Sequence, residues 1–318
     1  MGIGKEIAEK LIEKYNPKSV LFVPYKEEMW DTMFTIYEAF KGKEIKTDIM
    51  SMPYFTLNNG RIYDMKHEFD LFRPNFPMLL KEGQSDKYGG SKKWDIIIFH
   101  YPYDNLNNVT RPVMYSNELK AFCNNLVLVS YAVVGDRLPL SEELLYGGVV
   151  NSDLVITETE AQAEVANNFM KGYGIRTEFV GWGSAKYDMI ELAEIPKEWE
   201  EKGRGKRKVF LQTGLVPYLK DRNKLNKVEA IIRKNVNDPN VCLIWRPHPL
   251  LRDTIIAHHR GDLRKFTDLK ESVQKSEKDI WDESIMPETP IKFADEMISD
   301  ASSLVILWKK TGKKLTEV

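Results

Sequence analysis

The sequence contains only two cysteines, Cys123 and Cys242, and each lies in an apolar stretch. Two isolated thiols in such surroundings predict buried, reduced core residues and exclude a disulfide or a cysteine metal site. No apolar run approaches the length of a membrane span. Residues 1–16 show an amphipathic helix pattern without the apolar region of a signal peptide. These absences together predict a cytoplasmic protein.

A charge excess is also absent, because 46 Lys and Arg residues balance 47 Asp and Glu residues to a net charge of -1. A protein that binds nucleic acid through phosphates needs a basic surface, so we expect no nucleic-acid partner. The basic run at 202–208 is interpreted as part of a solvated linker; the alternative is peripheral contact with the inner face of a membrane. With 42% hydrophobic and 11% aromatic residues, the chain can form two domain cores.

Several catalytic motifs are missing as well. The sequence has no HExxH, paired CxxC, GxSxG or GxxxxGKS/T pattern. The motifs that identify zincins, α/β-hydrolases and P-loop NTPases are therefore absent, and the sequence does not indicate these functions. The adjacent His258 and His259 would project from different faces of a helix, which disfavours a metal site there. We therefore predict no metal site.

What the sequence does contain is a repeated alternation of short apolar runs and helical patterns, which is typical of parallel βαβ units. We predict two Rossmann-type α/β domains, at 1–195 and 208–318, joined by a linker at 196–207. The stretch at about 51–93 is predicted to be a long excursion with a hairpin at Asn58, Asn59 and Gly60. The predicted strands lie at 19–23, 47–50, 95–99, 126–129, 154–157, 178–180, 208–212, 241–245 and 296–299, and the predicted helices at 29–41, 160–171, 224–235, 262–274 and 301–310.

An Arg-Pro-His-Pro segment, residues 246–249, follows the predicted strand at 241–245. In open α/β sheets, ligands bind beyond the carboxyl ends of the strands. Arg246 offers a planar fork for a phosphate, and His248 can donate a hydrogen bond or move a proton. The structural alternative is a strand-end turn whose arginine forms a surface ion pair.

A second strand-end segment, residues 298–305, reads Ile-Ser-Asp-Ala-Ser-Ser-Leu-Val and is predicted to open a helix directly after a strand. The first-turn N–H groups and the helix dipole favour an anion, and Ser302 and Ser303 add hydroxyl donors. Asp300 is predicted to be the N-cap; the alternative is that the segment is only a well-capped helix. Thr213 and Gly214 follow the strand at 208–212, where a glycine lets the backbone approach a ligand.

A third segment, Phe-His-Tyr-Pro-Tyr-Asp at 99–104, follows the predicted strand at 95–99. It places His100 and Asp104 at the carboxyl edge of the first domain's sheet. His100 is a candidate general base for an acceptor hydroxyl, and Asp104 is a candidate to orient it or to act as the base itself. The alternative is a structural aromatic turn in which His100 bonds to the backbone.

Taken together, the segments at 245–249, 298–305 and 311–313 resemble the C-terminal half of the CDP-glycerol glycerophosphotransferase family. The segments at 23–31, 52–54, 100–104, 109–110 and 183–188 are similar to those of uncharacterised bacterial relatives of that family. The resemblance implies a GT-B-like fold, two Rossmann-like domains with a cleft between them. It implies that Arg246, His248, Ser302 and Ser303 contact the phosphates of a nucleotide-activated donor, and that no metal or cofactor is required.

The resemblance also implies an activity, the transfer of glycerol phosphate or a related group from a CDP-activated donor, CDP-glycerol, to a hydroxyl of a polymer or glycolipid acceptor. Two features depart from the family pattern. His100 is followed by Tyr101, where the family's catalytic histidine precedes a glycine. The family also continues past 311–313 with a strand and helices, so we expect a short C-terminal domain. The alternative functions are a nucleotide-sugar glycosyltransferase or epimerase of this fold, and a non-catalytic binding protein that kept the fold.

Overall fold

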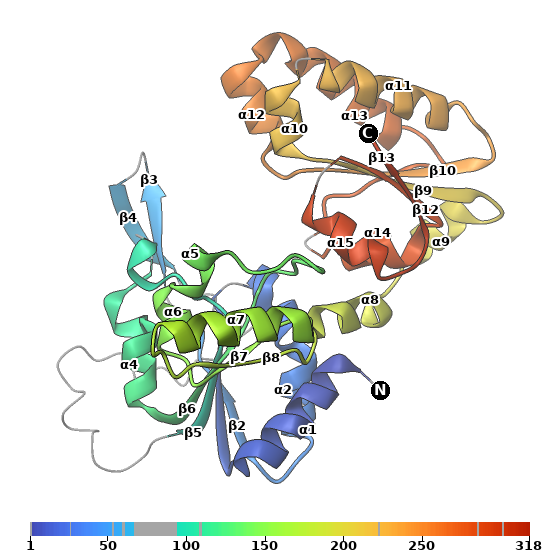
Figure 1. Ribbon diagram of the computed structural model, residues 1–318. Coiled ribbons are helices and arrows are strands. Elements are labelled where there is room, and N and C mark those ends of the chain that lie inside the picture. The colour runs from blue at the N-terminus through green and yellow to red at the C-terminus, as the bar shows by residue number, and fades with distance from the viewer. Residues whose placement is uncertain are drawn as a thin grey trace. The chain divides into compact units, whose positions relative to one another are not determined.

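The computed structural model describes residues 2–25, 27–52, 54–58, 61–66, 94–107, 110–221, 223–284, 286–300 and 302–318. The chain divides into two compact units, unit 1 at Met1–Asp188 and unit 2 at Met189–Val318, each built on a parallel sheet (Figure 1). The predicted fold class, two parallel-sheet α/β domains, is therefore confirmed.

The sheet of unit 1 has the strand order β2-β1-β5-β6-β7-β8, and all of its pairings are parallel. Successive residues of β1 alternate between two buried clusters, with Leu21 and Val23 in one and Val20 and Phe22 in the other. Both faces of the sheet are therefore covered, which explains why its inner strands are mostly apolar, whereas the edge strand β2 reads Lys-Thr-Asp-Ile. The strands are β1 (Ser19–Val23), β2 (Lys46–Ile49), β5 (Trp94–Phe99), β6 (Cys123–Val129), β7 (Leu154–Ile156) and β8 (Glu178–Val180).

Helices pack on both faces of this sheet, and Figure 1 shows the longest of the later ones, α7, beside β7 and β8. The order of the strands reverses between β1 and β5, so the carboxyl ends of these two strands form a topological switch point. The helical elements are α1 (Ile3–Tyr15), η1 (Glu27–Thr32), α2 (Phe34–Lys41), η2 (Asp104–Leu106), η3 (Pro112–Met114), α4 (Ser116–Ala121), α5 (Ser141–Leu144), α6 (Gly147–Val150), α7 (Glu160–Gly172), η4 (Ala185–Tyr187) and α8 (Asp188–Leu192).

Within the predicted excursion, β3 (Tyr54–Asn58) and β4 (Arg61–Lys66) pair antiparallel. This is the pairing that a hairpin at Asn58, Asn59 and Gly60 requires. Asn59 and Gly60, like residues 67–93 of the predicted excursion, lie outside the described residues.

The sheet of unit 2 has the order β11-β10-β9-β12-β13, again with parallel pairings only. The chain runs from β9 outward through β10 to β11 and then returns to β12 on the other side of β9, so the switch point lies at the carboxyl ends of β9 and β12. The elements are α9 (Lys197–Gly203), β9 (Arg207–Thr213), α10 (Leu215–Lys220), α11 (Lys224–Val236), β10 (Val241–Pro247), α12 (Leu251–His258), η5 (Arg260–Asp262), α13 (Leu263–Gln274), β11 (Ile280–Trp281), α14 (Glu288–Phe293), β12 (Glu296–Ser299), α15 (Ser303–Lys309) and β13 (Lys314–Glu317).

The boundary between the units differs from the predicted linker at 196–207. The division falls after Asp188, and most of the predicted linker forms helix α9. Trp199 packs its ring 5.7 Å from that of Phe293, and Lys202 Nζ donates to the carbonyl of Asp279. One face of α9 is therefore apolar despite the charged sequence, and the Trp199 contact on this face attaches the helix to unit 2.

Two further expectations concern the cysteines and the absence of a membrane-spanning helix. Cys123 and Cys242 are both buried, so the prediction that they lie in the cores is confirmed. Burial raises the pKa of the Cys242 thiol to about 11. Within the described part of the chain, no helix is both long and apolar enough to cross a membrane.

Candidate functional site

Three strand-end loops of unit 2 border one cavity of about 420 Å³, which we call the C-terminal cavity. The loops follow β9, β10 and β12, the three strands around the switch point. Five of the residues singled out from the sequence lie on its wall: Gly214, Arg246, His248, Ser302 and Ser303. Its other lining residues are Gln212, Leu215, Val216, Pro247, Pro249, Pro287 and Leu304. The structure therefore brings together segments that lie up to about ninety residues apart in the sequence, as the parallel-sheet reasoning predicts.

Thr213, the remaining predicted binding residue, lies behind the wall of this cavity. It is buried, its carbonyl accepts the backbone N–H of His248 at 2.8 Å, and its hydroxyl accepts Trp245 Nε1–H at 3.3 Å. Thr213 therefore ties the end of β9 to the His248 loop.

The hydrogen bonds of His248 define its neutral tautomer. Nδ1 accepts the backbone N–H of Leu250 at 3.1 Å, so the ring proton lies on Nε2. Desolvation lowers the pKa of His248, which keeps the ring neutral near pH 7. His248 can therefore donate one hydrogen bond from Nε2 without carrying a full positive charge.

Arg246 is held by the loop that follows β11. Its Nη1 lies 2.6 Å from Asp282 Oδ2 and 3.0 Å from Ser284 Oγ, and its Nη2 donates to the carbonyl of Ser284 at 2.7 Å. The two charged side chains are only 11% and 1% exposed. A buried pair of this kind fixes the guanidinium in place. Sequence reasoning missed Asp282 and Ser284, because the two-residue strand before them leaves no periodic signal.

Arg246 to Pro249 also borders a second cavity, of about 360 Å³, on the β11 side of the sheet. Trp281, Asp282 and Lys270 contribute to its wall, and Lys270 Nζ lies 4.6 Å from the centre of the Trp281 ring. The Arg-Pro-His-Pro segment therefore forms a partition with open space on both sides.

At the β12 end, the roles of the polar residues differ from the prediction. Ser302, not Asp300, is the N-cap of α15, and its hydroxyl accepts the N–H of Leu304 at 3.0 Å. Asp300 is buried; its Oδ1 accepts the N–H of Gly214 at 2.7 Å, and its Oδ2 lies 3.4 Å from Lys224 Nζ. The Asp300 carboxylate therefore does not cap α15. It connects the loop after β12 to the loop after β9.

In unit 1, His100 lies at the switch point between β1 and β5 and is completely buried. Its Nε2 accepts the backbone N–H of Tyr25 at 2.7 Å, and its Nδ1 lies 3.3 Å from the hydroxyl of Thr32. Burial lowers the pKa of His100 to about 3. A general base works best with a pKa near the working pH, so a base role requires His100 to release Tyr25. That role stays a prediction.

Asp104 is 7% exposed and serves the start of α4. Its carboxylate accepts the N–H of Ser116 at 2.9 Å and also the hydroxyl of that residue. Asp104 has a positive φ of 42°, and desolvation raises the pKa of its carboxyl group. Residue 104 therefore orders the loop between β5 and α4, and its proposed part in catalysis also stays a prediction.

No family model matches the chain, and no curated protein matches it. Solved structures do match along most of its length. Chains similar to this one include MnaA of S. aureus in complex with UDP, with a TM-score of 0.54, 10% identity, and coverage of 94% of this chain and 78% of that one. The UDP-GlcNAc 2-epimerase of Neisseria meningitidis bound to UDP-GlcNAc has a TM-score of 0.51, 11% identity, and coverage of 94% and 82%.

The wall teichoic acid polymerase TagF has a TM-score of 0.50 and 11% identity, with coverage of 98% of this chain and 72% of that one. Likeness at such low identity defines the fold alone. The chain is therefore a GT-B-like protein of two parallel-sheet α/β domains.

Proposed function

We propose that this chain binds a nucleotide-activated donor in the C-terminal cavity and transfers a phosphate-linked group from it to an acceptor hydroxyl. One observation carries the proposal. His248, Arg246 and the Ser302–Ser303 pair come from two different loops and border one cavity beside the switch point of the sheet. This is the edge at which open α/β sheets bind ligands, and these are side chains that suit phosphate oxygens.

In the proposed reaction, the acceptor oxygen attacks the phosphorus of the transferred group, and the bond from that phosphorus to the bridging oxygen breaks. The nucleoside monophosphate leaves with the electron pair. His248 Nε2–H and the Ser303 hydroxyl donate to the pyrophosphate oxygens as charge develops on the leaving group. The acceptor proton goes to a base, for which His100 and Asp104 are the candidates. No metal ion or further cofactor is included in the proposal, as the family resemblance implies.

The resemblance favours CDP-glycerol as the donor and a polymer or glycolipid hydroxyl as the acceptor. A thermal-shift panel tests the donor: CMP, CDP, CDP-glycerol, CDP-ribitol, UDP and UDP-GlcNAc at equal concentrations. Because a ligand that binds only the folded state stabilises it, we expect the cytidine diphosphates to raise the melting temperature and CMP to raise it less. Stabilisation by uridine nucleotides alone would favour a nucleotide-sugar transferase or epimerase. No response to any nucleotide would favour a non-catalytic protein.

Substitutions test whether this stabilisation by nucleotides arises from binding in the C-terminal cavity. A hydrogen bond to a charged group contributes about 1.5–3 kcal/mol, so His248→Ala should weaken CDP binding about 10- to 100-fold. Ser303 is exposed and caps nothing, so Ser303→Ala should weaken binding by less without loss of stability. His258→Ala is the matched control, because His258 is exposed on α12. Equal effects of the two histidine variants would contradict the proposed site.

The proposal places the protein in the cytoplasm. Peripheral membrane contact would use the basic run at 202–208, in which Lys202, Arg207 and Lys208 each pair with an acidic side chain and so contribute less free positive charge. Sedimentation with anionic vesicles tests it, and we expect no retention at physiological salt.

A further inference from the structure

Gln212 lies near the carboxyl end of β9, the central strand of the unit 2 sheet. In the sheet register it is the partner of Arg246 on β10 and of Ser299 on β12. It is one of the residues that line the C-terminal cavity, although only 5% of the residue is exposed. The contacts proposed above come from the segments that follow β10 and β12, and Gln212 offers a side chain from the strand between them.

The two ends of the Gln212 amide have different surroundings. Oε1 accepts the hydroxyl of Ser299 at 2.7 Å. Nε2 donates to no described residue, and it is not among the side-chain atoms of the described residues that are both enclosed and without a partner. The Nε2 atom therefore keeps access to open space, and the space that Gln212 borders is the C-terminal cavity.

The Ser299 hydroxyl determines which end of the amide faces the cavity. This hydroxyl lies 2.7 Å from Gln212 Oε1 and 2.7 Å from the carbonyl oxygen of Asp300, and its single proton serves one of the two acceptors. When the proton goes to Oε1, the Gln212 N–H groups face the cavity. An anion in the cavity selects this arrangement, because only N–H groups attract its oxygens.

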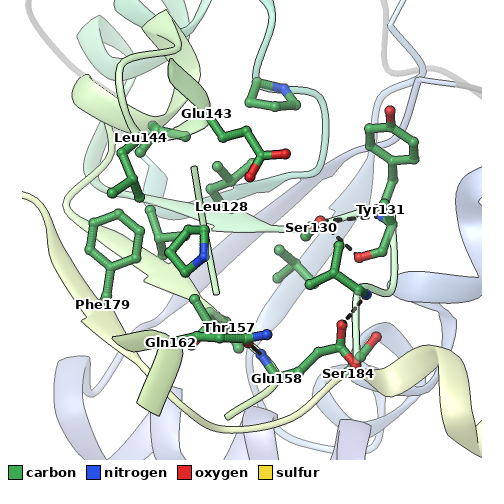
Figure 2. A pocket seen from close by; sticks show the side chains of 18 of the residues that line it. Leu128, Ser130, Tyr131, Glu143, Leu144, Thr157, Glu158, Gln162, Phe179 and Ser184 are labelled. Carbon is green, nitrogen blue, oxygen red and sulfur yellow. Dashed lines mark hydrogen bonds between the residues drawn. The ribbon is translucent and has the colours of Figure 1, made fainter. Parts of the chain in front are cut away.

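The wall of the C-terminal cavity favours an anion. None of its described lining residues is acidic, and Arg246 is the one with a full charge. The cavity at the carboxyl ends of β6 and β7 differs in this respect, because Figure 2 shows the Glu143 and Glu158 carboxylates on its wall. An amide nitrogen with free N–H groups on a wall without carboxylates suits an oxygen-rich anion.

From these observations we infer that Gln212 is a further ligand-binding residue of the C-terminal cavity, and that its Nε2 donates to a phosphate oxygen of the nucleotide-activated donor. The inference rests on the proposed function, because it adds one contact to the same site. With His248 after β10 and Ser303 after β12, hydrogen-bond donors then come from three neighbouring strands. Gln212 takes the central place among them.

Calorimetric titration of the full chain with CDP and with inorganic pyrophosphate tests this contact. Gln212→Met keeps a side chain of similar length but removes the donor, and Ser299 retains the Asp300 carbonyl as its acceptor, so the fold should be kept. This variant should weaken both ligands about 10- to 100-fold, the effect of one hydrogen bond to a charged group. Gln212→Glu keeps an acceptor for Ser299 but places a carboxylate at the phosphate, so it should weaken binding more than Gln212→Met. Melting temperatures without ligand check that each variant folds.

Two matched variants separate ligand contact from a structural role. Ser299→Ala removes the protein partner of the Gln212 amide but leaves its N–H groups in place, so it should weaken binding less than Gln212→Met. Gln274→Glu makes the same charge change at an exposed position of α13 and should leave binding unchanged.

The outcomes distinguish this contact from the nucleotide site itself. Wild-type affinity in Gln212→Met, tighter binding in Gln212→Glu than in Gln212→Met, or equal losses in Ser299→Ala and Gln212→Met would overturn the Gln212 contact and leave the site standing. Binding of pyrophosphate without CDP would contradict the nucleotide donor, while the variants would still decide the Gln212 contact. Binding of neither ligand to the wild-type chain would overturn both proposals.

Discussion

Replacing His100 with glutamine tests how the buried histidine at the β1–β5 switch point links stability to pH. The imidazole is completely buried, and its Nε2 accepts the N–H of Tyr25 at 2.7 Å. Burial lowers the pKa of His100 to about 3, from an ordinary value of 6.5. Glutamine keeps an acceptor for the Tyr25 amide but cannot be protonated in this range.

The direction follows from proton binding. Below pH 6.5 the unfolded chain takes up a proton at His100 and the folded chain does not, so acid favours unfolding until the pH reaches about 3. Each pH unit in this window costs up to about 1.4 kcal/mol. Lowering the pH from 6.5 to 5 should therefore remove about 2 kcal/mol of the free energy of unfolding of unit 1.

The assay is urea unfolding at pH 7.5, 6.5, 5.5 and 5.0, followed by pulsed hydrogen exchange and mass spectrometry, which resolves peptides of unit 1 from those of unit 2. The difference between wild type and His100→Gln isolates this residue from all other titrating groups. We expect the variant to lose about 2 kcal/mol less than wild type between pH 6.5 and 5, and His258→Gln to behave as wild type. Parallel loss in wild type and His100→Gln would refute the reasoning.

Three further predictions concern the packing around the two sheets. Arg246→Ala leaves the buried carboxylate of Asp282 without its partner and should destabilise unit 2 by about 3–5 kcal/mol in urea unfolding; a loss below 1 kcal/mol would contradict the buried pair. Asp188 accepts two first-turn N–H groups of α1 at 2.8 Å, so Asp188→Ala should cost about 1–2 kcal/mol and speed hydrogen exchange in α1; unchanged exchange would argue against this cap. A Cβ at Gly148 would lie 2.5 Å from a backbone atom, whereas at Gly172 it would meet nothing within 4 Å, so Gly148→Ala should cost about 1–3 kcal/mol and Gly172→Ala should cost none.

The strands of both cores could be predicted from the sequence because their physical cause is local. A parallel strand buried on both faces is a continuous apolar run, and β1, β5 and β10 are such runs. The missed strands lack this property. β13 (Lys-Leu-Thr-Glu) is an edge strand with mostly exposed residues, and β11 is two residues long.

The grouping of the candidate site was predictable for a similar reason. In a parallel sheet, residues that follow neighbouring strands meet at one edge, so Arg246, His248 and Ser303 had to lie near one another once the strands were known. Their partners were not predictable. Asp282 and the pair of Lys224 with Asp300 come from distant parts of the chain, and no local pattern records such contacts.

The burial of His100 illustrates the same limit. A histidine directly after a strand can face a ligand or the core, and the two placements share one sequence pattern. The contact with Tyr25, a residue 75 positions away, decides between them. The cavity at the carboxyl ends of β6 and β7 could not be predicted from the sequence either, because its wall combines the ends of these strands with segments as far apart as Pro102 and Ser184.

A crystal structure of the chain with CDP tests the central claim most directly. We predict electron density for the diphosphate in the C-terminal cavity, with His248 Nε2 and the Ser303 hydroxyl within about 3 Å of phosphate oxygens. Density for the diphosphate at any other place on the chain, or an empty cavity at a CDP concentration that saturates binding in solution, would contradict the claim.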